Sequence, residues 1–233
     1  MSLRWLVLFD IDGTLLSASG ISARALGAAL LEVFRTEGPI DGYDYSGKTD
    51  PQIVRELMRA AGLAEAVIEN KRAEALERYR VRLQASLRSE HVVAKPGVHA
   101  LVEALAADPR VALGLLTGNL EPCARLKLEP LGLNGRFSFG AFGSDDEDRS
   151  RLPALAVERA YARTRTRFEG KSTVIVGDAV ADVLCGRNLG VRAVAVATGR
   201  TPASALAAAG PDALLPDLAD TQRALAAIRG EPA

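Results

Sequence analysis

Two aspartates stand two residues apart near the start of the chain, in the segment Asp10-Ile11-Asp12-Gly13-Thr14. They follow the apolar run at residues 6–9, which predicts a strand buried on both faces. Residues i and i+2 of an extended segment project to the same side, so both carboxylates would face one crevice. Such a pair repels unless a cation or a shared proton relieves the charge, so it suits a metal site or a pair that shares a proton. Gly13 would allow the sharp turn, and the Thr14 hydroxyl would tie the loop.

A turn with incidental acids is the competing interpretation of this segment, because Asp and Gly are common turn residues. A calcium loop fits poorly, since the EF-hand ligand spacing is absent and a strand comes first.

A second polar group, Thr117-Gly118-Asn119, follows the apolar run at residues 111–116. A hydroxyl and a glycine-freed backbone just before a helix suit an anionic oxygen. The alternative there is that Asn119 is only a helix N-cap.

A third strand end carries acids. Asp178 follows the apolar run at residues 173–176, and Asp182 lies one helical turn later, so the two can face one site. The alternative is that Asp178 caps a helix and Asp182 favours the helix dipole. Asp10, Asp12 and Asp178 would form a cluster of oxygen ligands alone. Such a cluster suits Mg²⁺, or the chemically similar Mn²⁺, rather than zinc.

Apolar runs alternate with segments of helical periodicity over most of the chain. The runs are residues 6–9, 111–116, 137–142, 173–176 and 192–197, and the helical segments are 97–107, 121–131, 152–168 and 179–189. This alternation predicts an α/β fold with a doubly wound, mainly parallel, Rossmann-like sheet. Ligands of such sheets bind beyond the carboxyl ends of the strands, where the aspartates stand. The tail predicts a short closing strand near residues 213–215 with helices on either side.

Residues 17–91 break the alternation, because they contain helical patterns and no predicted strand. Asp50 as N-cap and Pro51 as first helical residue would open one helix. Residues 65–88 predict a long, charged helix whose apolar side includes Val67. An all-helical insertion directly after the first strand would lie over the crevice like a lid.

Length and composition limit the class of protein. The chain has 233 residues, of which 48% are hydrophobic, as in soluble globular proteins. We expect a core of residues 1–16 and 92–233 and a helical domain of residues 17–91. The 29 basic residues balance 29 acidic ones, so neither nucleic acid nor a membrane is an expected partner.

The two cysteines, Cys123 and Cys185, have neither a disulfide framework nor zinc-site spacing, which suits a reducing compartment. No apolar stretch approaches the ~20 residues of a membrane span. The first residues lack the small-residue cleavage site of a signal peptide. We therefore expect a cytoplasmic protein.

The motifs DxDGT at residues 10–14, TGN at 117–119 and GDxxxD at 177–182 occur in this order and accompany a helical insertion after the first motif. In this combination the chain resembles the haloacid dehalogenase-like (HAD) hydrolase superfamily. It is similar to the phosphoglycolate-phosphatase-like members, which carry a helical C1-type cap. The resemblance covers nearly the whole chain and implies an aspartate-nucleophile phosphotransferase.

The resemblance also implies roles for the acids. Asp10 would attack phosphorus to give an aspartyl-phosphate. Asp12 would be the general acid for the leaving alcohol and then the base for the hydrolytic water. Mg²⁺ would bind Asp10, the Asp12 backbone carbonyl and Asp178, with Asp182 supporting it through water or a hydrogen bond.

Thr117 and the amides of Gly118 and Asn119 would hold the phosphoryl oxygens. The family also has a cation, commonly lysine, just before the helix that leads to the fourth strand. This chain has no lysine there, so Arg149 or Arg151 must serve, and arginine can clamp two phosphoryl oxygens at once. We favour Arg149, because it leaves room for the turn before the next proline.

Asp12 and Lys48 bear on the reaction and the substrate. Dehalogenating members lack a carboxylate at the position of Asp12, because halide needs no proton to leave, so phosphate ester cleavage is favoured. Lys48 lies in a polar loop similar to the GRTD-like loop of phosphoglycolate-phosphatase-type caps, and it is a candidate contact for the substrate's non-phosphate end. A solvated Lys48 is the alternative. We expect an Mg²⁺-dependent phosphatase acting on a small phosphorylated metabolite, either phosphoglycolate-like or a sugar phosphate.

Other functions would use some of the same residues. A phosphomutase of the β-phosphoglucomutase type would use the same two aspartates and return the phosphate to the sugar. A phosphonatase would need Lys48 as a Schiff base, whereas a non-catalytic phospho-aspartate binding protein would not need Asp12. A dehydrogenase is poorly supported, because no GxGxxG follows the first strand. A monomer and a homodimer are both left open.

Overall fold

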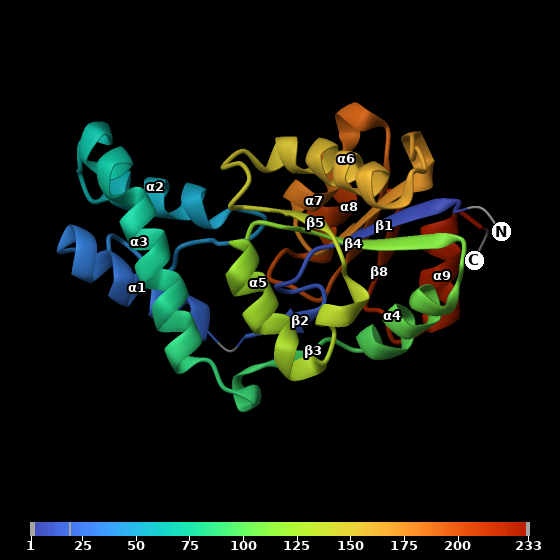
Figure 1. Cartoon of the computed structure of the whole chain (residues 1–233), viewed down its shortest axis with the longest axis horizontal. Coiled ribbons are helices and arrows are strands. Elements are labelled where there is room, and N and C mark those ends of the chain that lie inside the picture. Colours follow the sequence, from blue (N-terminus) through green and yellow to red (C-terminus); the bar gives the residue numbers. More distant parts are fainter. Residues whose placement is uncertain (1–2, 19, 232–233) are drawn as a thin grey trace.

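A computed structural model of the chain describes residues 3–18 and 20–231. Within these residues, one sheet has six parallel strands in the order β5-β4-β1-β6-β7-β8 (Figure 1). The strands are β1 (Trp5–Phe9), β4 (Val111–Thr117), β5 (Gly140–Phe142), β6 (Thr173–Gly177), β7 (Arg192–Val196) and β8 (Ala213–Leu215). The predicted α/β class with a doubly wound parallel sheet is confirmed, and so is the closing strand of the tail.

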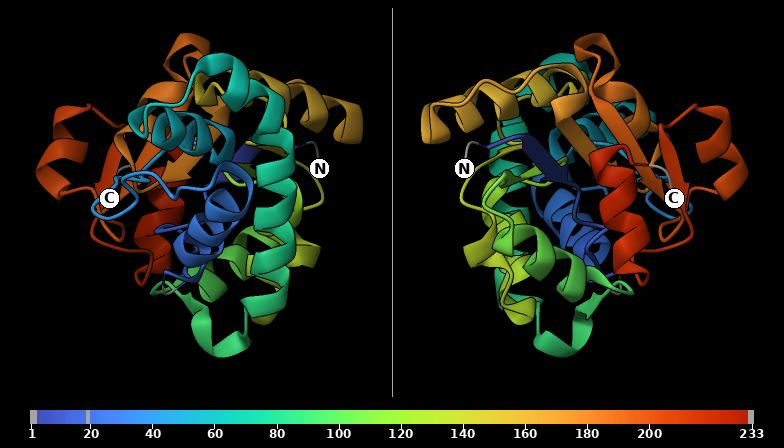
Figure 2. Two further views of the ribbon diagram at one scale, coloured as in Figure 1. Left: turned by 90° about the vertical axis from the view of Figure 1, so that its left-hand side faces the viewer. Right: turned by 90° about the vertical axis from the view of Figure 1, so that its right-hand side faces the viewer.

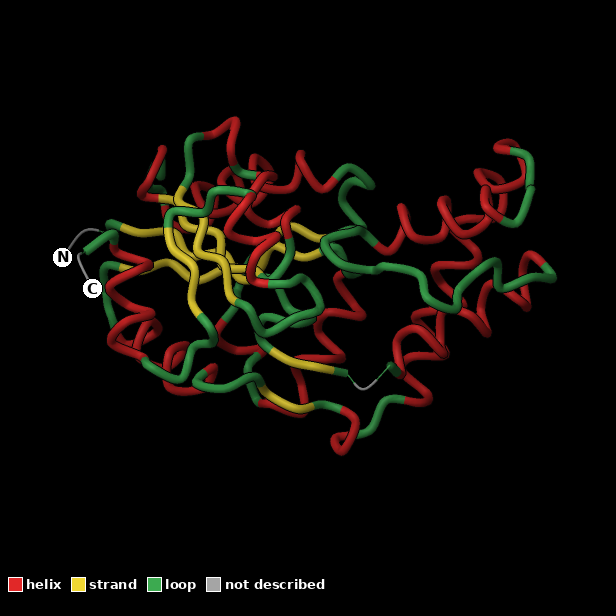
Figure 3. The backbone as a smooth tube through the Cα atoms, turned by 180° about the vertical axis from the view of Figure 1, so that it is seen from behind, coloured by secondary structure: helices red, strands yellow, loops and turns green. Residues whose placement is uncertain are grey.

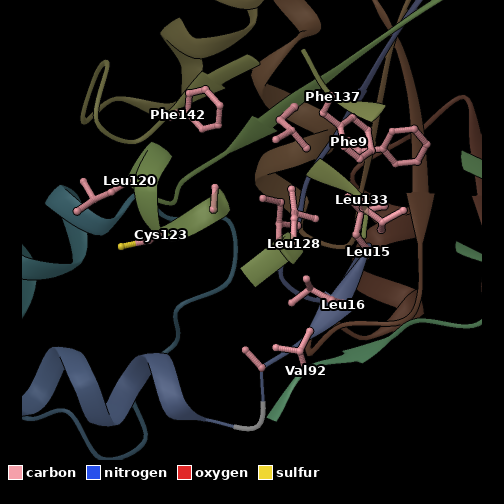
Figure 4. Packing of buried hydrophobic residues seen from close by; sticks show 14 of the residues in the cluster. Phe9, Leu15, Leu16, Val92, Leu120, Cys123, Leu128, Leu133, Phe137 and Phe142 are labelled. Atoms are coloured by element: carbon pink, nitrogen blue, oxygen red, sulfur yellow. The ribbon is translucent and has the colours of Figure 1, made fainter. Parts of the chain in front are cut away.

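Helices cover both faces of this sheet. One face is covered by α4 (Val98–Ala107), α5 (Glu121–Leu128) and α9 (Thr221–Arg229), and the other by α6 (Leu152–Thr164), α7 (Val180–Cys185) and α8 (Ala203–Ala208) (Figure 1). The side chains of β1 alternate between the two layers, since Val7 and Phe9 join the core under α4, α5 and α9 while Leu8 joins the core under α6. Phe9 meets Phe137 edge-on, with ring centroids 6.1 Å apart (Figure 4).

The remaining long helices are α1 (Ile21–Phe34), α2 (Asp50–Ala60) and α3 (Glu65–Ser86), here called the three-helix unit. They lie together at the end of the molecule that the carboxyl ends of the strands face (Figure 1). Figure 2 (left) looks at the molecule from this end, with α1 and α3 in front of the sheet. In Figure 3 the strands gather in one body, whereas the three-helix unit contains only helices and loops.

Two details of the three-helix unit differ from the sequence prediction. Val67 is 42% exposed, because the buried stripe of α3 runs through Ile68, Ala75, Tyr79 and Leu83 and leaves it to one side. Its prediction as an apolar-face residue is wrong.

The start of α2 is the second difference. The N-cap is Thr49, whose hydroxyl accepts a hydrogen bond from the Gln52 amide at 3.2 Å, and Asp50 is the first helical residue. The prediction of Asp50 as N-cap is therefore wrong by one residue. The Asp50 side chain is consequently not used for capping.

A small antiparallel ribbon pairs β2 (Leu16–Ser17) with β3 (Val93–Ala94) where the chain leaves and re-enters the body that holds the large sheet. Its strand includes Ser17, so the prediction that residues 17–91 lack any strand is wrong at their first residue. The reason is that the two crossing segments run side by side and complete each other's backbone hydrogen bonds.

The predicted strand at residues 137–142 is also shorter than expected. Only Gly140–Phe142 pairs with β4, because a turn of 3₁₀-helix at Asn134–Arg136 brings the chain to the sheet edge late. Four helices, α3, α5, α6 and α7, end earlier than predicted. The described 3₁₀ turns are Ser89–His91, Glu129–Leu131, Asn134–Arg136, Arg149–Arg151, Gly170–Ser172 and Arg187–Leu189. Two of these turns replace the last residues of predicted helices, after α5 and after α7.

Candidate active site at the carboxyl edge of the sheet

The parallel register brings the strand-end motifs together. Phe9, the last residue of β1, pairs with Leu115 of β4 on one side and with Val176 of β6 on the other. The segments that follow these strands therefore start at the same edge, as expected for parallel strands. Asp10, Thr117 and Asp178 all lie there and are buried.

Three buried carboxylates form the centre of the site. One oxygen from each of Asp10, Asp178 and Asp182 lies within 4.8 Å of the others. Burial and the Asp182 carboxylate raise the pKa of Asp10 to about 7. Burial and the Asp10 carboxylate raise the pKa of Asp178 to about 8. Hard oxygen ligands that repel one another fit a divalent cation such as Mg²⁺ or Mn²⁺, which would relieve the repulsion.

Gly13 and Thr14 hold one member of this cluster. The Thr14 hydroxyl donates to Asp178 Oδ1 at 2.8 Å. Gly13 has φ +89°, and a Cβ at this position would overlap the Asp178 carboxylate. A glycine is therefore required both by the backbone conformation and by the space.

Asp182 combines two roles. Its Oδ2 accepts the Ala179 amide at 2.9 Å, which satisfies a free donor at the start of α7. Its Oδ1 pairs with the Arg149 guanidinium. Asp178, by contrast, does not cap this helix, whose N-cap is Ala179.

Arg149 is the cation that the structure places beside Asp10. Its side chain is buried, and Nη2 donates to Asp10 Oδ1 at 3.0 Å. The Nε of Arg149 is buried with no hydrogen-bond partner in the described part of the chain. Arg151 instead has a side chain that is 71% exposed and pairs with Asp146 at 3.3 Å. Of the two candidate arginines, only Arg149 reaches the carboxylate cluster.

Asp12 lies outside the three-carboxylate cluster. Its Oδ2 accepts hydrogen bonds from Asn119 Nδ2 at 2.8 Å and from Lys127 Nζ at 2.7 Å. The side chain is 43% exposed, whereas the Asp10 side chain is 10% exposed. The two aspartates of the first motif thus occupy different environments, one among acids and one beside a lysine.

The second motif lines the space between these aspartates. Asn119 does not cap α5, because Leu120 stands at the N-cap. Its amide nitrogen Nδ2 donates to Thr117 Oγ1 at 2.7 Å. Gly118 lies directly under the loop before α2, and a Cβ there would overlap the Lys48 carbonyl.

Lys127 is a site residue that the motifs did not reveal. Its side chain is 3% exposed, and Nζ contacts both Asp12 and Asn119 Oδ1, the latter at 2.5 Å. Burial alone would lower the pKa of Lys127, but the carboxylates of Asp12 and Asp50 outweigh it and raise that pKa. The available signal was its place among the buried residues of α5, where lysine is rare.

Two further residues of the site were missed. Asp50 is buried, and its Oδ2 accepts the Leu120 amide at 2.8 Å. Gly199 follows β7, and a Cβ there would overlap the Asp178 carboxylate. The rule that placed the other motifs at strand ends applies to Gly199 as well.

A cavity of about 370 Å³ opens over these residues, and the three-helix unit forms its far wall. Its lining combines Asp10, Asp12 and Lys127 with apolar side chains such as Leu26 and Ile53. Lys48 also lines the cavity, but its Nζ donates to Glu56 Oε2 at 2.6 Å and to the Tyr43 hydroxyl at 3.1 Å. Lys48 therefore presents an ammonium group that already has a carboxylate partner.

The chain matches known proteins in sequence and in structure. Residues 7–187 match the family described as haloacid dehalogenase-like hydrolase, and this span contains all three motifs. The chain belongs to the haloacid dehalogenase-like hydrolase family. The resemblance inferred from the motifs is therefore confirmed.

Among HAD-like relatives, the phosphoglycolate phosphatase of Pseudomonas fluorescens strain Pf0-1 is 27% identical over 215 residues, which cover 91% of this chain and 76% of that protein. The phosphoglycolate phosphatase of Synechococcus elongatus is 27% identical over 94% of this chain and 96% of that protein. The predicted phosphatase of Clostridium acetobutylicum has a similar structure, with a TM-score of 0.73 at 18% identity over 96% of this chain and 99% of that chain. A hydrolase of Pseudomonas syringae gives 0.70 at 20% identity over 95% and 97% of the two chains.

Over residues 3–18 and 20–231, none of the helices is both long and apolar enough to cross a membrane. 

Proposed function

We propose that the protein is a metal-dependent phosphatase that hydrolyses a small phosphate monoester through an aspartyl-phosphate. The observation that carries the proposal is the contrast between Asp10 and Asp12. Asp10 is buried among acids and contacts Arg149, whereas Asp12 is half-exposed and is held by Lys127. Two carboxylates with such different environments suit two different roles, one as nucleophile and one as acid and base.

The reaction has two steps. An Asp10 oxygen forms a bond to phosphorus as the ester P–O bond breaks, and Asp12 donates a proton to the departing alkoxide. Asp12 then removes a proton from a water molecule, which attacks phosphorus and releases phosphate and Asp10. Asp12 Oδ2 already accepts two hydrogen bonds, so we assign the proton to Oδ1.

The remaining motif residues would hold the phosphoryl group. Thr117 Oγ1 and the amides of Gly118 and Asn119 would donate to its oxygens. The unpartnered Nε of Arg149 supports a further donor to the same group. These donors would act where charge develops in the transition state, which is the main contribution a protein makes to phosphoryl transfer.

We assign the metal to Asp10, Asp178 and the backbone carbonyl of Asp12, with Asp182 supporting it. A bound Mg²⁺ would neutralise charge on the carboxylates and on the phosphoryl oxygens. Magnesium itself is part of the proposal, since Mn²⁺ accepts the same oxygen ligands. The raised pKa values of Asp10 and Asp178 support the assignment, because they reflect burial and repulsion between carboxylates, and a bound cation would offset both.

We further propose that residues 17–91 act as a cap domain on a core of residues 1–16 and 92–233. The cavity of about 370 Å³ beneath this cap has room for a small metabolite. The names of the two relatives point to phosphoglycolate as the first substrate to test, and Lys48 is the candidate contact for the non-phosphate end. A cytoplasmic location is supported by the two cysteines, which are free and buried.

The test is release of inorganic phosphate from a panel that includes phosphoglycolate, sugar phosphates and p-nitrophenyl phosphate. Each ester is assayed with Mg²⁺, with Mn²⁺ and with EDTA. We expect metal-dependent release that Asp10→Asn lowers by about 10⁴-fold or more, while Asp41→Asn, at an exposed position, leaves it unchanged. Release that survives in Asp10→Asn would refute the nucleophile. Conversion of a sugar phosphate to its isomer without phosphate release would identify a phosphomutase instead.

A further inference from the structure

Glu147 connects the three-helix unit to the loop that carries Arg149. Arg55 of α2 donates to both oxygens of the Glu147 carboxylate, from Nε to Oε1 at 2.6 Å and from Nη2 to Oε2 at 2.8 Å. Arg72 of α3 pairs with the same carboxylate. The Thr49 hydroxyl donates to the Glu147 backbone carbonyl at 2.8 Å. One residue of the loop between β5 and α6 is thus held by three side chains of the cap proposed above.

The same loop is the support of the active-site arginine. Arg149 stands two residues after Glu147, buried against Asp10. The other end of the loop is fixed to the phosphate-binding motif, because the Gly143 amide donates to the Asn119 carbonyl at 2.8 Å. Core contacts hold the first part of the loop, where Arg159 of α6 donates to Asp145 Oδ2 at 2.6 Å, whereas the cap side chains hold it at Glu147, two residues before Arg149.

A second contact joins the three-helix unit to the phosphate-binding motif. The Asp50 amide donates to the Gly118 carbonyl at 2.7 Å, and Asp50 Oδ2 accepts the Leu120 amide at 2.8 Å. The start of α2 thus rests on one phosphate-binding segment while Arg55, farther along α2, contacts the other. Docking of this helix would align both segments.

We propose that Glu147 is a positioning residue that couples docking of the three-helix unit to the placement of Arg149. The inference rests on the proposed function, since it assigns Arg149 to the phosphoryl group. When Arg55 and Arg72 engage Glu147, the loop is held in the conformation that sets Arg149 against Asp10. When they release it, the loop loses that restraint and Arg149 is left with its own contacts to Asp10 and Asp182.

The ion pairs are suited to a reversible contact. The side chains of Glu147, Arg55 and Arg72 are 27%, 20% and 23% exposed, so water and salt reach them. Both arginines also have carboxylate partners within the three-helix unit, since Arg55 pairs with Glu65 and Arg72 with Glu69. Loss of Glu147 would therefore leave the unit's own ion pairs in place, and a Glu147 variant should fold.

The experiment compares Glu147→Gln with the matched control Glu32→Gln. Glu32 also receives two arginines, Arg78 and Arg82, but both lie within the three-helix unit. The readouts are kcat and KM for the best ester of the panel, and hydrogen–deuterium exchange of residues 143–151. We expect kcat to fall about fivefold in Glu147→Gln, as for the loss of one partly exposed charged contact, and the loop amides to exchange faster. Glu32→Gln should change neither readout.

A double variant separates positioning from a general loss of stability. If Glu147 acts through Arg55, then Arg55→Gln added to Glu147→Gln should cost little more than the single change. The wild-type kcat should also fall with added salt, and that of Glu147→Gln should respond less. Unchanged kcat and unchanged loop exchange in Glu147→Gln would overturn the proposal. A wild-type protein that releases no phosphate would instead refute the proposed function, while the exchange of residues 143–151 would still report on the contact.

Discussion

Replacing Asp178 by asparagine should stabilise the metal-free protein at neutral pH. Asp178 is 5% exposed, and burial together with the Asp10 carboxylate raises its pKa from 3.8 to about 8. Because this pKa is higher in the folded than in the unfolded state, ionised Asp178 opposes folding. Its contribution to stability is full below about pH 4 and is lost as the pH rises towards 8. Asparagine carries no charge and can still accept the hydrogen bond from Thr14.

The size of the effect follows from the pKa difference. One pKa unit corresponds to about 1.4 kcal/mol, so ionising Asp178 alone at pH 7.5 would cost up to ~5 kcal/mol. The cost is smaller in the protein, because Asp178 and Asp10 share one repulsion and Arg149 offsets part of it. We expect the free energy of unfolding of Asp178→Asn to exceed that of the wild type by about 2 kcal/mol at pH 7.5, and by about zero at pH 4.

The assay is urea unfolding followed by circular dichroism, in EDTA, at pH 4, 5.5 and 7.5. Asp212→Asn is the matched control with the opposite sign. Burial would raise the pKa of Asp212, but Lys171 at 2.6 Å and the Ala193 amide at 2.8 Å outweigh it and lower that pKa. Ionised Asp212 therefore stabilises the fold above about pH 4, and its replacement should destabilise the protein at pH 7.5.

Saturating Mg²⁺ should reverse the order of wild type and Asp178→Asn. A ligand that binds only the folded state adds stability in proportion to the logarithm of its concentration over Kd, and the variant would lack one ligand. The reasoning would be refuted if Asp178→Asn were less stable than the wild type in EDTA at pH 7.5. A gain of equal size at pH 4 would also contradict it, since charge could not then be the cause.

Three further substitutions test the site. Lys127→Met should lower kcat about 100-fold for alkyl phosphates and less for p-nitrophenyl phosphate, because the leaving group of the latter needs no proton from Asp12. Equal losses of kcat for both esters in steady-state assays would argue against a role of Lys127 through Asp12. Arg149→Lys should lower kcat/KM about 100-fold, because lysine cannot donate to two oxygens in a fixed plane. A loss below threefold would contradict the proposal that Arg149 donates to two phosphoryl oxygens. Gly199→Ala should weaken Mg²⁺ binding in calorimetry, since the methyl group of the alanine would displace Asp178. A folded variant that binds Mg²⁺ with wild-type affinity would contradict the placement of Asp178 at the metal site.

The acids of the site could be predicted because their positions depend on strand ends. The apolar runs before Asp10, Thr117 and Asp178 each form a central strand, and parallel pairing then brings the residues that follow to one edge. No knowledge of side-chain packing is needed for this step. The same rule would have found Gly199 after β7, had it been applied to the fifth strand.

Side-chain partners could not be predicted in this way. Lys127 reaches Asp12 from a position 115 residues away in sequence, and Arg55 reaches Glu147 over 92 residues. Such contacts depend on how separate helices meet, and no local pattern encodes that. The start of α2 shows the same limit at short range, because Thr49 and Asp50 are both good N-caps. Their distant partners, Glu147 for Thr49 and Leu120 for Asp50, are not visible in the local sequence.

The distribution of charge explains why the site holds two cations in separate places. Arg149 stands among the three carboxylates of the cluster, which leaves a net charge of −2 when all are ionised. One divalent cation would balance that charge, and a phosphate ester could then approach Asp10 with less repulsion. Lys127 stands instead beside Asp12 and Asp50 and cannot serve the cluster. Lys127 contacts Asp12 outside the cluster, whereas Arg149 contacts Asp10 and Asp182 within it, so substitutions of the two cations perturb separate halves of the site.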